Sequence, residues 1–216
     1  MFHSLTHHPD LTQQQHRALP GLSNTDLGHL ADAVLGRPHR DCAAAFNFGS
    51  LFHAAILEPD VFAALPVTTH RTELTARANA LALARAVRRQ RYPRHVLYRG
   101  VPEQSYTATH EATGLLVKVR PDLLIDSPQR RRRTLIDFKT TSCRDRAQFL
   151  TTIEEYAYDR QAAFYADVLN ARRVVLIAVQ KKAPFAVWTH ELTAEQMEAG
   201  RKKYQRLLRE AARQRV

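Results

Sequence analysis

Cysteine and long apolar segments are scarce in this chain. It has 216 residues but only two cysteines, Cys42 and Cys143, which lie far apart and outside any Cys-x-x-Cys motif. The sequence therefore indicates neither a disulfide framework nor a zinc site. No run of about 18 or more apolar residues is present, and the polar, histidine-containing N-terminus lacks the apolar core of a signal peptide. We expect a protein that stays in the cytoplasm and does not contact a membrane.

Internal repeats, low-complexity tracts and interdomain linkers are also absent from the sequence. A length of 216 residues with 44% hydrophobic content suits one α/β domain with a sizeable core. We expect this domain over residues 21–216, whereas residues 1–20 are polar and poorly periodic and predict a flexible N-terminal arm. Because nothing resembles a zinc finger or a helix-turn-helix module, sequence-specific reading of DNA is not indicated.

Basic residues outnumber acidic ones. The chain has 32 lysines and arginines against 21 aspartates and glutamates, a formal net charge of +11. Such an excess favours a polyanionic partner such as nucleic acid. A diffuse charge that only keeps the protein soluble explains the composition equally well, so charge alone does not decide.

The most informative pattern is a pair of aspartates in two strand-like runs. Asp122, within Arg-Pro-Asp, is followed 15 positions later (137 − 122) by Asp137-Phe138-Lys139. The segment between the two runs is rich in turn formers and charge, which predicts an antiparallel hairpin that brings both carboxylates together. Two buried carboxylates repel each other unless a cation neutralises them, and oxygen ligands favour Mg²⁺ or Mn²⁺. We therefore expect a metal site here.

Three further side chains belong to this pattern. The strand period of two places Lys139 on the same face as Asp137, where its ammonium can orient a water or stabilise negative charge at a phosphate. Gln161 and Tyr165 are four residues apart and share one face of an expected helix. Without the Asp-x-Lys motif, these two would be read as ordinary packing residues.

Together these residues resemble the PD-(D/E)xK nuclease superfamily, and Gln161-x-x-x-Tyr165 resembles the extra motif of its RecB and lambda-exonuclease branch. Further matches narrow the resemblance to the RecE-type (exodeoxyribonuclease VIII-like) exonucleases of phage recombination over roughly residues 20–205. They are Gly21-Leu22-Ser23, Gly49-Ser-Leu-Phe-His53 running into Leu57-Glu58-Pro59, Glu103-Gln-Ser105, Thr113-Gly114 and Asp137-Phe-Lys-Thr-Thr141. Two cysteines cannot supply four thiolates, which argues against the iron–sulfur branch.

The resemblance implies a fold and a function. The fold is α/β, restriction-endonuclease-like, with an αβββαβ core and a central mixed sheet flanked by helices. The function is a Mg²⁺-dependent exonuclease that degrades linear duplex DNA in the 5′ to 3′ direction, as a ring-shaped homo-oligomer that works beside a single-strand annealing protein. Two alternatives stay open: a RecB-like single-strand nuclease or endonuclease, and a DNA-binding protein of nuclease fold that does not cut.

The resemblance also implies site residues. His53 and the backbone carbonyl of Phe138 join Asp122 and Asp137 as metal ligands, and Glu103 matches the family's Glu-x-Ser element. Gln161 is expected to reach a metal-bound water or a phosphate, and the Tyr165 hydroxyl a DNA phosphate. Judged only by its place beside an apolar helical stripe, His53 would be structural.

Three basic segments are candidates for the DNA path. Our first choice is the hairpin tip, which we expect to project close to the carboxylates, and the last helix presents a basic stripe that could equally be a solvated face. The third segment surrounds Tyr92 and Pro93. The basic residues of the three segments, in this order, are Arg130, Arg131, Arg132 and Arg133; Lys202, Arg206, Arg209 and Arg213; and Arg85, Arg88, Arg89, Arg91 and Arg94.

Hydrophobic periodicity and end signals predict the remaining elements. We expect helices over about 23–35, 47–58, 73–90 and 153–169, and a last helix capped by Thr193. Strands are expected over about 103–109, 115–125, 134–139, 174–179 and 185–192. The resulting order, αααβββαββα, contains the αβββαβ core that the resemblance implies.

Overall fold

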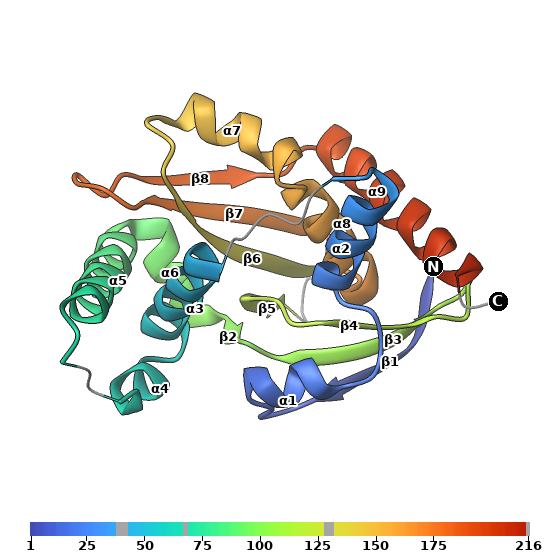
Figure 1. Cartoon of the computed structure of the whole chain (residues 1–216), viewed down its shortest axis with the longest axis horizontal. Helices are drawn as coiled ribbons and strands as arrows, with labels where there is room; N and C mark the ends of the chain where they lie inside the picture. The colour runs from blue at the N-terminus through green and yellow to red at the C-terminus, as the bar shows by residue number, and fades with distance from the viewer. Residues whose placement is uncertain (38–42, 67–68, 128–131, 215–216) are drawn as a thin grey trace.

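The structure is a computed structural model that describes residues 1–37, 43–66, 69–127 and 132–214, so Cys42, Arg130 and Arg131 lie outside the described residues. At its centre is a mixed five-stranded sheet of order β2-β5-β6-β7-β8, in which only β6 and β7 are parallel (Figure 1). This is the restriction-endonuclease-like α/β architecture that the sequence predicts. The strands are β2 (Val101–Pro102), β5 (Leu123–Ser127), β6 (Arg132–Thr141), β7 (Arg173–Gln180) and β8 (Val187–Glu191).

Helices cover both faces of this sheet, because its inner strands bury apolar side chains on both sides. On β6, Leu135 packs into one cluster and Ile136 and Phe138 into the other. The first cluster lies under α7 (Arg146–Glu155), α8 (Tyr158–Leu169) and α9 (Ala194–Arg213). The second lies under α3 (Ala43–Leu57), α4 (Pro59–Ala64), α5 (Arg71–Arg89) and α6 (Arg91–Arg99). Among the described residues, no helix is long and apolar enough to cross a membrane.

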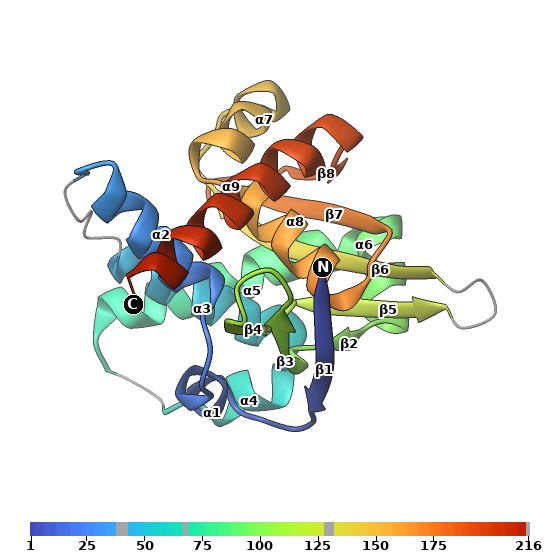
Figure 2. The same cartoon turned by 90° about the vertical axis from the view of Figure 1, so that its right-hand side faces the viewer.

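The N-terminal segment is not the free arm that its polar sequence predicts. Residues Phe2–His8 form β1, which pairs antiparallel with β3 (Ser105–His110), and β3 pairs with β4 (Leu116–Val119) in a separate three-stranded sheet (Figure 2). Two helices follow, α1 (Gln13–Ala18) and α2 (Asn24–Val34), which Thr12 and Ser23 cap. Five of the seven β1 side chains are exposed, so backbone pairing rather than an apolar pattern defines this edge strand.

The expected strand over 115–125 is two strands in two sheets. β4 ends at Val119 and β5 begins at Leu123, and the three residues between them, Arg120-Pro121-Asp122, form the corner from one sheet to the other. Proline has no backbone N–H to give to a ladder, which explains a break at this point. The corner leaves Asp122 immediately before β5.

The expected helix over 153–169 is likewise divided. α7 starts at Asp145, which caps it by accepting from the Gln148 backbone N–H at 2.8 Å, and ends before Ala157, whose φ of 54° is left-handed. Because a left-handed residue cannot continue an α-helix, α8 begins in a new direction at Tyr158. This turn aims the face that carries Gln161 and Tyr165 at the sheet.

Candidate metal centre and active site

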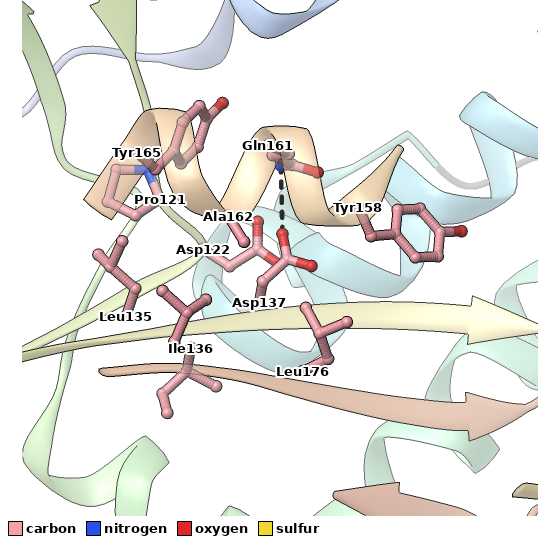
Figure 3. Close-up of a pocket in the computed structure, with 11 residues that line it drawn as sticks. Pro121, Asp122, Leu135, Ile136, Asp137, Tyr158, Gln161, Ala162, Tyr165 and Leu176 are labelled. Atoms are coloured by element: carbon pink, nitrogen blue, oxygen red, sulfur yellow. Dashed lines mark hydrogen bonds between the residues drawn. The ribbon is translucent and has the colours of Figure 1, made fainter. Parts of the chain in front are cut away.

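The β5–β6 hairpin brings the two aspartates together, as the sequence predicts. Leu123 pairs with Ile136, so the next position along each strand places Asp122 beside Asp137. Figure 3 shows the two carboxylates side by side beneath Gln161 of α8. β5 begins only at Leu123, whereas β6 runs on past Ile136. Among the described residues, the Phe138 backbone therefore has no partner in β5. Its N–H instead donates to Asp122 Oδ2 at 2.6 Å.

His53 of α3 reaches the same place from the other face of the sheet. Its Nε2 lies 2.9 Å from the Phe138 carbonyl oxygen, which can only accept, so the ring proton is assigned to Nε2. The lone pair of Nδ1 then faces Asp122 Oδ1 at 3.5 Å. A histidine that ligates a metal typically donates its other N–H to such an acceptor. The Phe138 carbonyl, expected as a ligand, here orients His53.

Glu103 completes a group that we call the ligand cluster: His53, Glu103 and Asp122. One ligand atom from each of these residues lies within 4.8 Å of the others. Glu103 follows β2 with a left-handed φ of 53°, an uncommon conformation for this residue type, and the Arg120 guanidinium holds its carboxylate at 2.6 Å. The sequence indicated Glu103 only through the resemblance, and Arg120 was not recognised as its partner.

The ligand cluster carries more negative charge than its surroundings compensate. Burial, followed by the charge of Asp137, raises the pKa of Asp122 to about 8. Burial, followed by the charge of Asp122, raises the pKa of Glu103 to about 7, and burial lowers the pKa of His53 so that its ring is neutral. Two carboxyl groups with raised pKa values beside an imidazole with a lowered pKa are a donor set that fits Mg²⁺ or Mn²⁺, since a bound cation stabilises their deprotonated forms.

The neighbouring group, which we call the lysine cluster, is Asp137, Lys139 and Gln161. Lys139 Nζ donates to Asp137 Oδ1 at 2.9 Å and to Gln161 Oε1 at 3.0 Å, while Gln161 Nε2 donates to Asp137 Oδ1 at 3.2 Å. Asp137 Oδ2 lies 2.7 Å from the same ammonium without hydrogen-bond geometry, so among the described residues this oxygen has no hydrogen-bond partner. It is the oxygen of Asp137 that remains available to a cation.

Lys139 is a fixed positive charge in this arrangement. Burial opposes its charged form, but the carboxylates of Asp137 and Asp122 outweigh burial and raise its pKa. The ammonium also lies 4.9 Å from the centre of the Tyr158 ring, a cation–π contact that the sequence did not reveal. Its signal was present, since Tyr158 precedes Gln161 by three residues and shares its helical face. A lysine held in this way can donate hydrogen bonds to a water or phosphate but cannot accept a proton.

Tyr165 has a different surrounding from the one expected. Figure 3 shows its hydroxyl pointing away from the two carboxylates, and the hydroxyl is in hydrogen-bond contact with the backbone of Arg120. Burial raises its pKa, so the hydroxyl stays protonated. In this position Tyr165 supports the corner between the two sheets, and no contact with a DNA phosphate is needed to explain its place.

Among the described residues, the expected DNA-binding side chains form no ion pair with the carboxylates of the site. Ser127 pairs with Arg132 at the hairpin tip, five residues along β5 from Asp122, which is about 17 Å of extended chain. The described parts of β5 and β6 therefore lead away from the carboxylates, and Arg130 and Arg131, part of our first choice for the DNA path, lie outside the described residues. Arg133 is occupied by Asp126 and the Leu169 carbonyl. Lys202 and Arg206 are exposed on α9, which runs alongside α8 (Figure 2).

Comparison with known proteins agrees with this geometry. Residues 28–214 match the family described as "PDDEXK-like domain of unknown function (DUF3799)". The chain belongs to this family. Its fold is similar to that of a "Putative exonuclease" from Eubacterium rectale, with a TM-score of 0.65 and 15% identity over 97% of this chain and 89% of that one. The structure of SSO0001, with a TM-score of 0.37 and 13% identity over 83% of each chain, is too different to add to the argument. No curated protein matches.

Proposed function

We propose that this PDDEXK-like protein is a divalent-metal-dependent nuclease that hydrolyses phosphodiester bonds in DNA. The observation that carries the proposal is that two groups lie side by side: the ligand cluster, whose two carboxyl groups have raised pKa values, and Asp137 with its attached lysine. The first suits a cation and the second suits a phosphate, which is the pairing that metal-assisted hydrolysis of phosphodiesters requires.

Each residue has a distinct task in this proposal. One or two Mg²⁺ or Mn²⁺ ions would be held by His53 Nδ1, Glu103, Asp122 and Asp137 Oδ2, the Asp137 oxygen that accepts no hydrogen bond among the described residues. When bound, the metal supplies Lewis-acid stabilisation and a more acidic water. Lys139 positions the attacking water and stabilises charge on the phosphate oxygens. Gln161 holds both Lys139 and Asp137 in register through its amide.

The mode of cutting is a finer proposal. A 5′ to 3′ exonuclease acting on linear duplex DNA in phage-type recombination is supported by the resemblance of the motifs to RecE-type enzymes and by the fold shared with the "Putative exonuclease". A ring-shaped homo-oligomer and a single-strand annealing partner rest on that resemblance alone. A RecB-like single-strand nuclease, an endonuclease and a non-cutting DNA-binding protein use the same fold.

One digestion experiment separates these possibilities. Linear duplex labelled at either end, closed circular duplex and single-stranded DNA are incubated with the protein in Mg²⁺ and in EDTA. We expect loss of the linear duplex only in Mg²⁺, with label from the 5′ end released first and the closed circle intact. Cutting of the closed circle would assign an endonuclease, and cleavage restricted to single strands would assign a RecB-like activity. No cleavage with any divalent metal would overturn the proposal.

A further inference from the structure

A groove opens beside the ligand cluster on the α3–α6 side of the sheet. It has a volume of about 370 Å³. Two of its lining residues are the neighbours of metal-site residues: Pro102 precedes Glu103, Leu123 follows Asp122, and the two pair across β2 and β5. The groove is therefore bordered by the β2–β5 pair at the residues next to Glu103 and Asp122. Its other walls come from the end of α3 and from α4, α5 and α6, and include Arg88, Arg94 and Tyr98.

Two of the helices that border this groove, α5 and α6, carry most of the protein's excess charge. Residues 71–99 contain eight arginines and one glutamate, a net +7 (8 − 1) out of +11 for the chain. Two of the eight are structural: Arg77 donates to the Phe62 carbonyl, and Arg88 donates to the carbonyls of Ala55 and Ile56 at the end of α3. The other six are exposed and form no ion pair within the part of the chain that the structure describes: Arg71, Arg85, Arg89, Arg91, Arg94 and Arg99.

An aromatic ring stands out on the same surface. Tyr98 is 87% exposed, although a tyrosine normally buries most of its ring. Arg91, Arg94 and Tyr98 are spaced three and four residues apart along α6, so they share one helical face. Exposed aromatic rings alternating with cations are what a protein uses to bind a single nucleic-acid strand, whose bases stack while its phosphates pair with arginine.

We infer that the groove and the α6 face formed by Arg91, Arg94 and Tyr98 bind one single strand of nucleic acid and lead it to the metal site. This inference rests on the proposed nuclease function. A single strand fits better than a duplex, because only an unpaired base offers a free face to Tyr98. The arginines without an ion pair among the described residues favour a polyanion as the molecule that binds this surface.

Two charge variants test the inference against a matched control. Arg91→Ser/Arg94→Ser removes two exposed cations from α6, and Lys202→Ser/Arg206→Ser removes two exposed cations from α9. Binding of a labelled single-stranded oligonucleotide is measured by anisotropy in EDTA over a range of salt. We expect the α6 variant to flatten the log–log salt dependence by roughly 1.4 units, about 0.7 for each lost contact, and the α9 variant to leave it unchanged.

Tyr98 gives a second, independent readout. Tyr98→Ala should weaken single-strand binding roughly 5- to 100-fold, whereas Tyr98→Phe, which keeps the ring, should bind like the wild type. Because the side chain is exposed, neither change should alter folding. Equal binding by Tyr98→Ala and the wild type would remove the stacking part of the inference.

The outcomes separate this inference from the proposed function. If the wild type cuts DNA but the α6 and α9 variants show the same salt dependence, the inference fails and the nuclease stands. If the wild type neither cuts nor binds DNA, both fail. If polyglutamate displaces the oligonucleotide as well as unlabelled DNA does, the surface belongs to an acidic protein partner and the inference is overturned.

Discussion

The two clusters of the candidate site differ in how the charge of their buried aspartate is balanced. In the lysine cluster, Asp137 receives the ammonium of Lys139 and the amide of Gln161, so its charge is balanced within the protein. In the ligand cluster, Asp122 has a backbone N–H and a neutral histidine, and its pKa is raised to about 8 by burial and by Asp137. A buried carboxylate without a counter-charge is unfavourable unless something else supplies the charge. The comparison indicates that the ligand cluster suits a bound cation, whereas the lysine cluster contains its own.

The largest effect should come from removing either carboxylate's charge. Asp122→Asn and Asp137→Asn should each lower cleavage by at least about a thousandfold, because metal stabilisation of the transition state contributes several kcal/mol. DNA affinity in EDTA should be retained, since losing an anion does not weaken attraction to phosphate. Cleavage near the wild-type rate by either variant would show that its cluster lies outside the active site.

The second prediction concerns the ammonium of Lys139, which balances Asp137. Lys139→Met should lower turnover on the order of 100-fold, because it removes a positioned donor at the reacting phosphate, and it should change DNA affinity little. The measurement is single-turnover cleavage beside binding in EDTA. Should affinity fall as much as rate, Lys139 is a DNA anchor rather than part of the chemistry.

Stability should distinguish the two clusters most directly. In EDTA, Asp137→Asn should lower the free energy of unfolding by about 3 kcal/mol, because it leaves the buried ammonium of Lys139 without its counter-charge. Asp122→Asn should be neutral or stabilising near pH 8, because it removes a charge that burial disfavours. Urea unfolding of both variants measures the difference. An equal loss in both would contradict the contrast between the clusters.

The pH dependence of stability should report on the carboxylates of the ligand cluster. The pKa of Asp122 rises from 3.8 to about 8 and that of Glu103 from 4.5 to about 7, so both groups hold protons more tightly in the folded than in the unfolded chain. The metal-free protein should therefore lose on the order of 1 kcal/mol as pH rises from about 6.5 to 8. Mn²⁺ should reverse this loss, more at pH 8 than at pH 6.5, in melting curves with metal and with EDTA.

A buried histidine acts in the opposite direction at lower pH. Burial, followed by the charge of Arg120, lowers the pKa of His16 from 6.5 to about 4. Its folded form binds fewer protons than the unfolded chain, so its contribution is lost as pH falls from 6.5 toward 4. A metal-free stability that keeps rising above pH 6.5 would contradict the protonated state of the ligand cluster.

The smallest effect should come from the hairpin tip. Arg132 is exposed and about 17 Å of strand away from Asp122, so Arg132→Ser should change cleavage less than about twofold. Cleavage of linear duplex at low salt is the measurement. A larger loss would mean that DNA reaches the tip, and the path along α6 would need revision.

The sequence predicted the site better than it predicted the support around it. The spacing of Asp122, Asp137 and Lys139 on adjacent strands specifies a local hairpin, and Thr193 caps the last helix as predicted. Pro121, which has no backbone N–H, indicated a strand break, but the apolar residues on both sides of it led us to expect one strand over 115–125. Arg120 and Tyr158 join the site only through contacts between distant segments, which periodicity does not encode. The pairing of polar β1 with β3 has the same origin.

Arg120 connects the first residues of the chain to the candidate metal centre. Its guanidinium donates at once to Glu103, to the Ser105 hydroxyl and to the carbonyl of Leu11, while Lys118 next to it binds the carbonyls of Arg17 and Leu19. The Arg120 guanidinium thus links Leu11 to the Glu103 carboxylate, which lies 92 positions further along the chain (103 − 11). A fusion tag or trimmed end that shifts Leu11 would reorient Arg120, and Glu103 would lose its fixed position. The contact of Leu11 is therefore part of what positions Glu103.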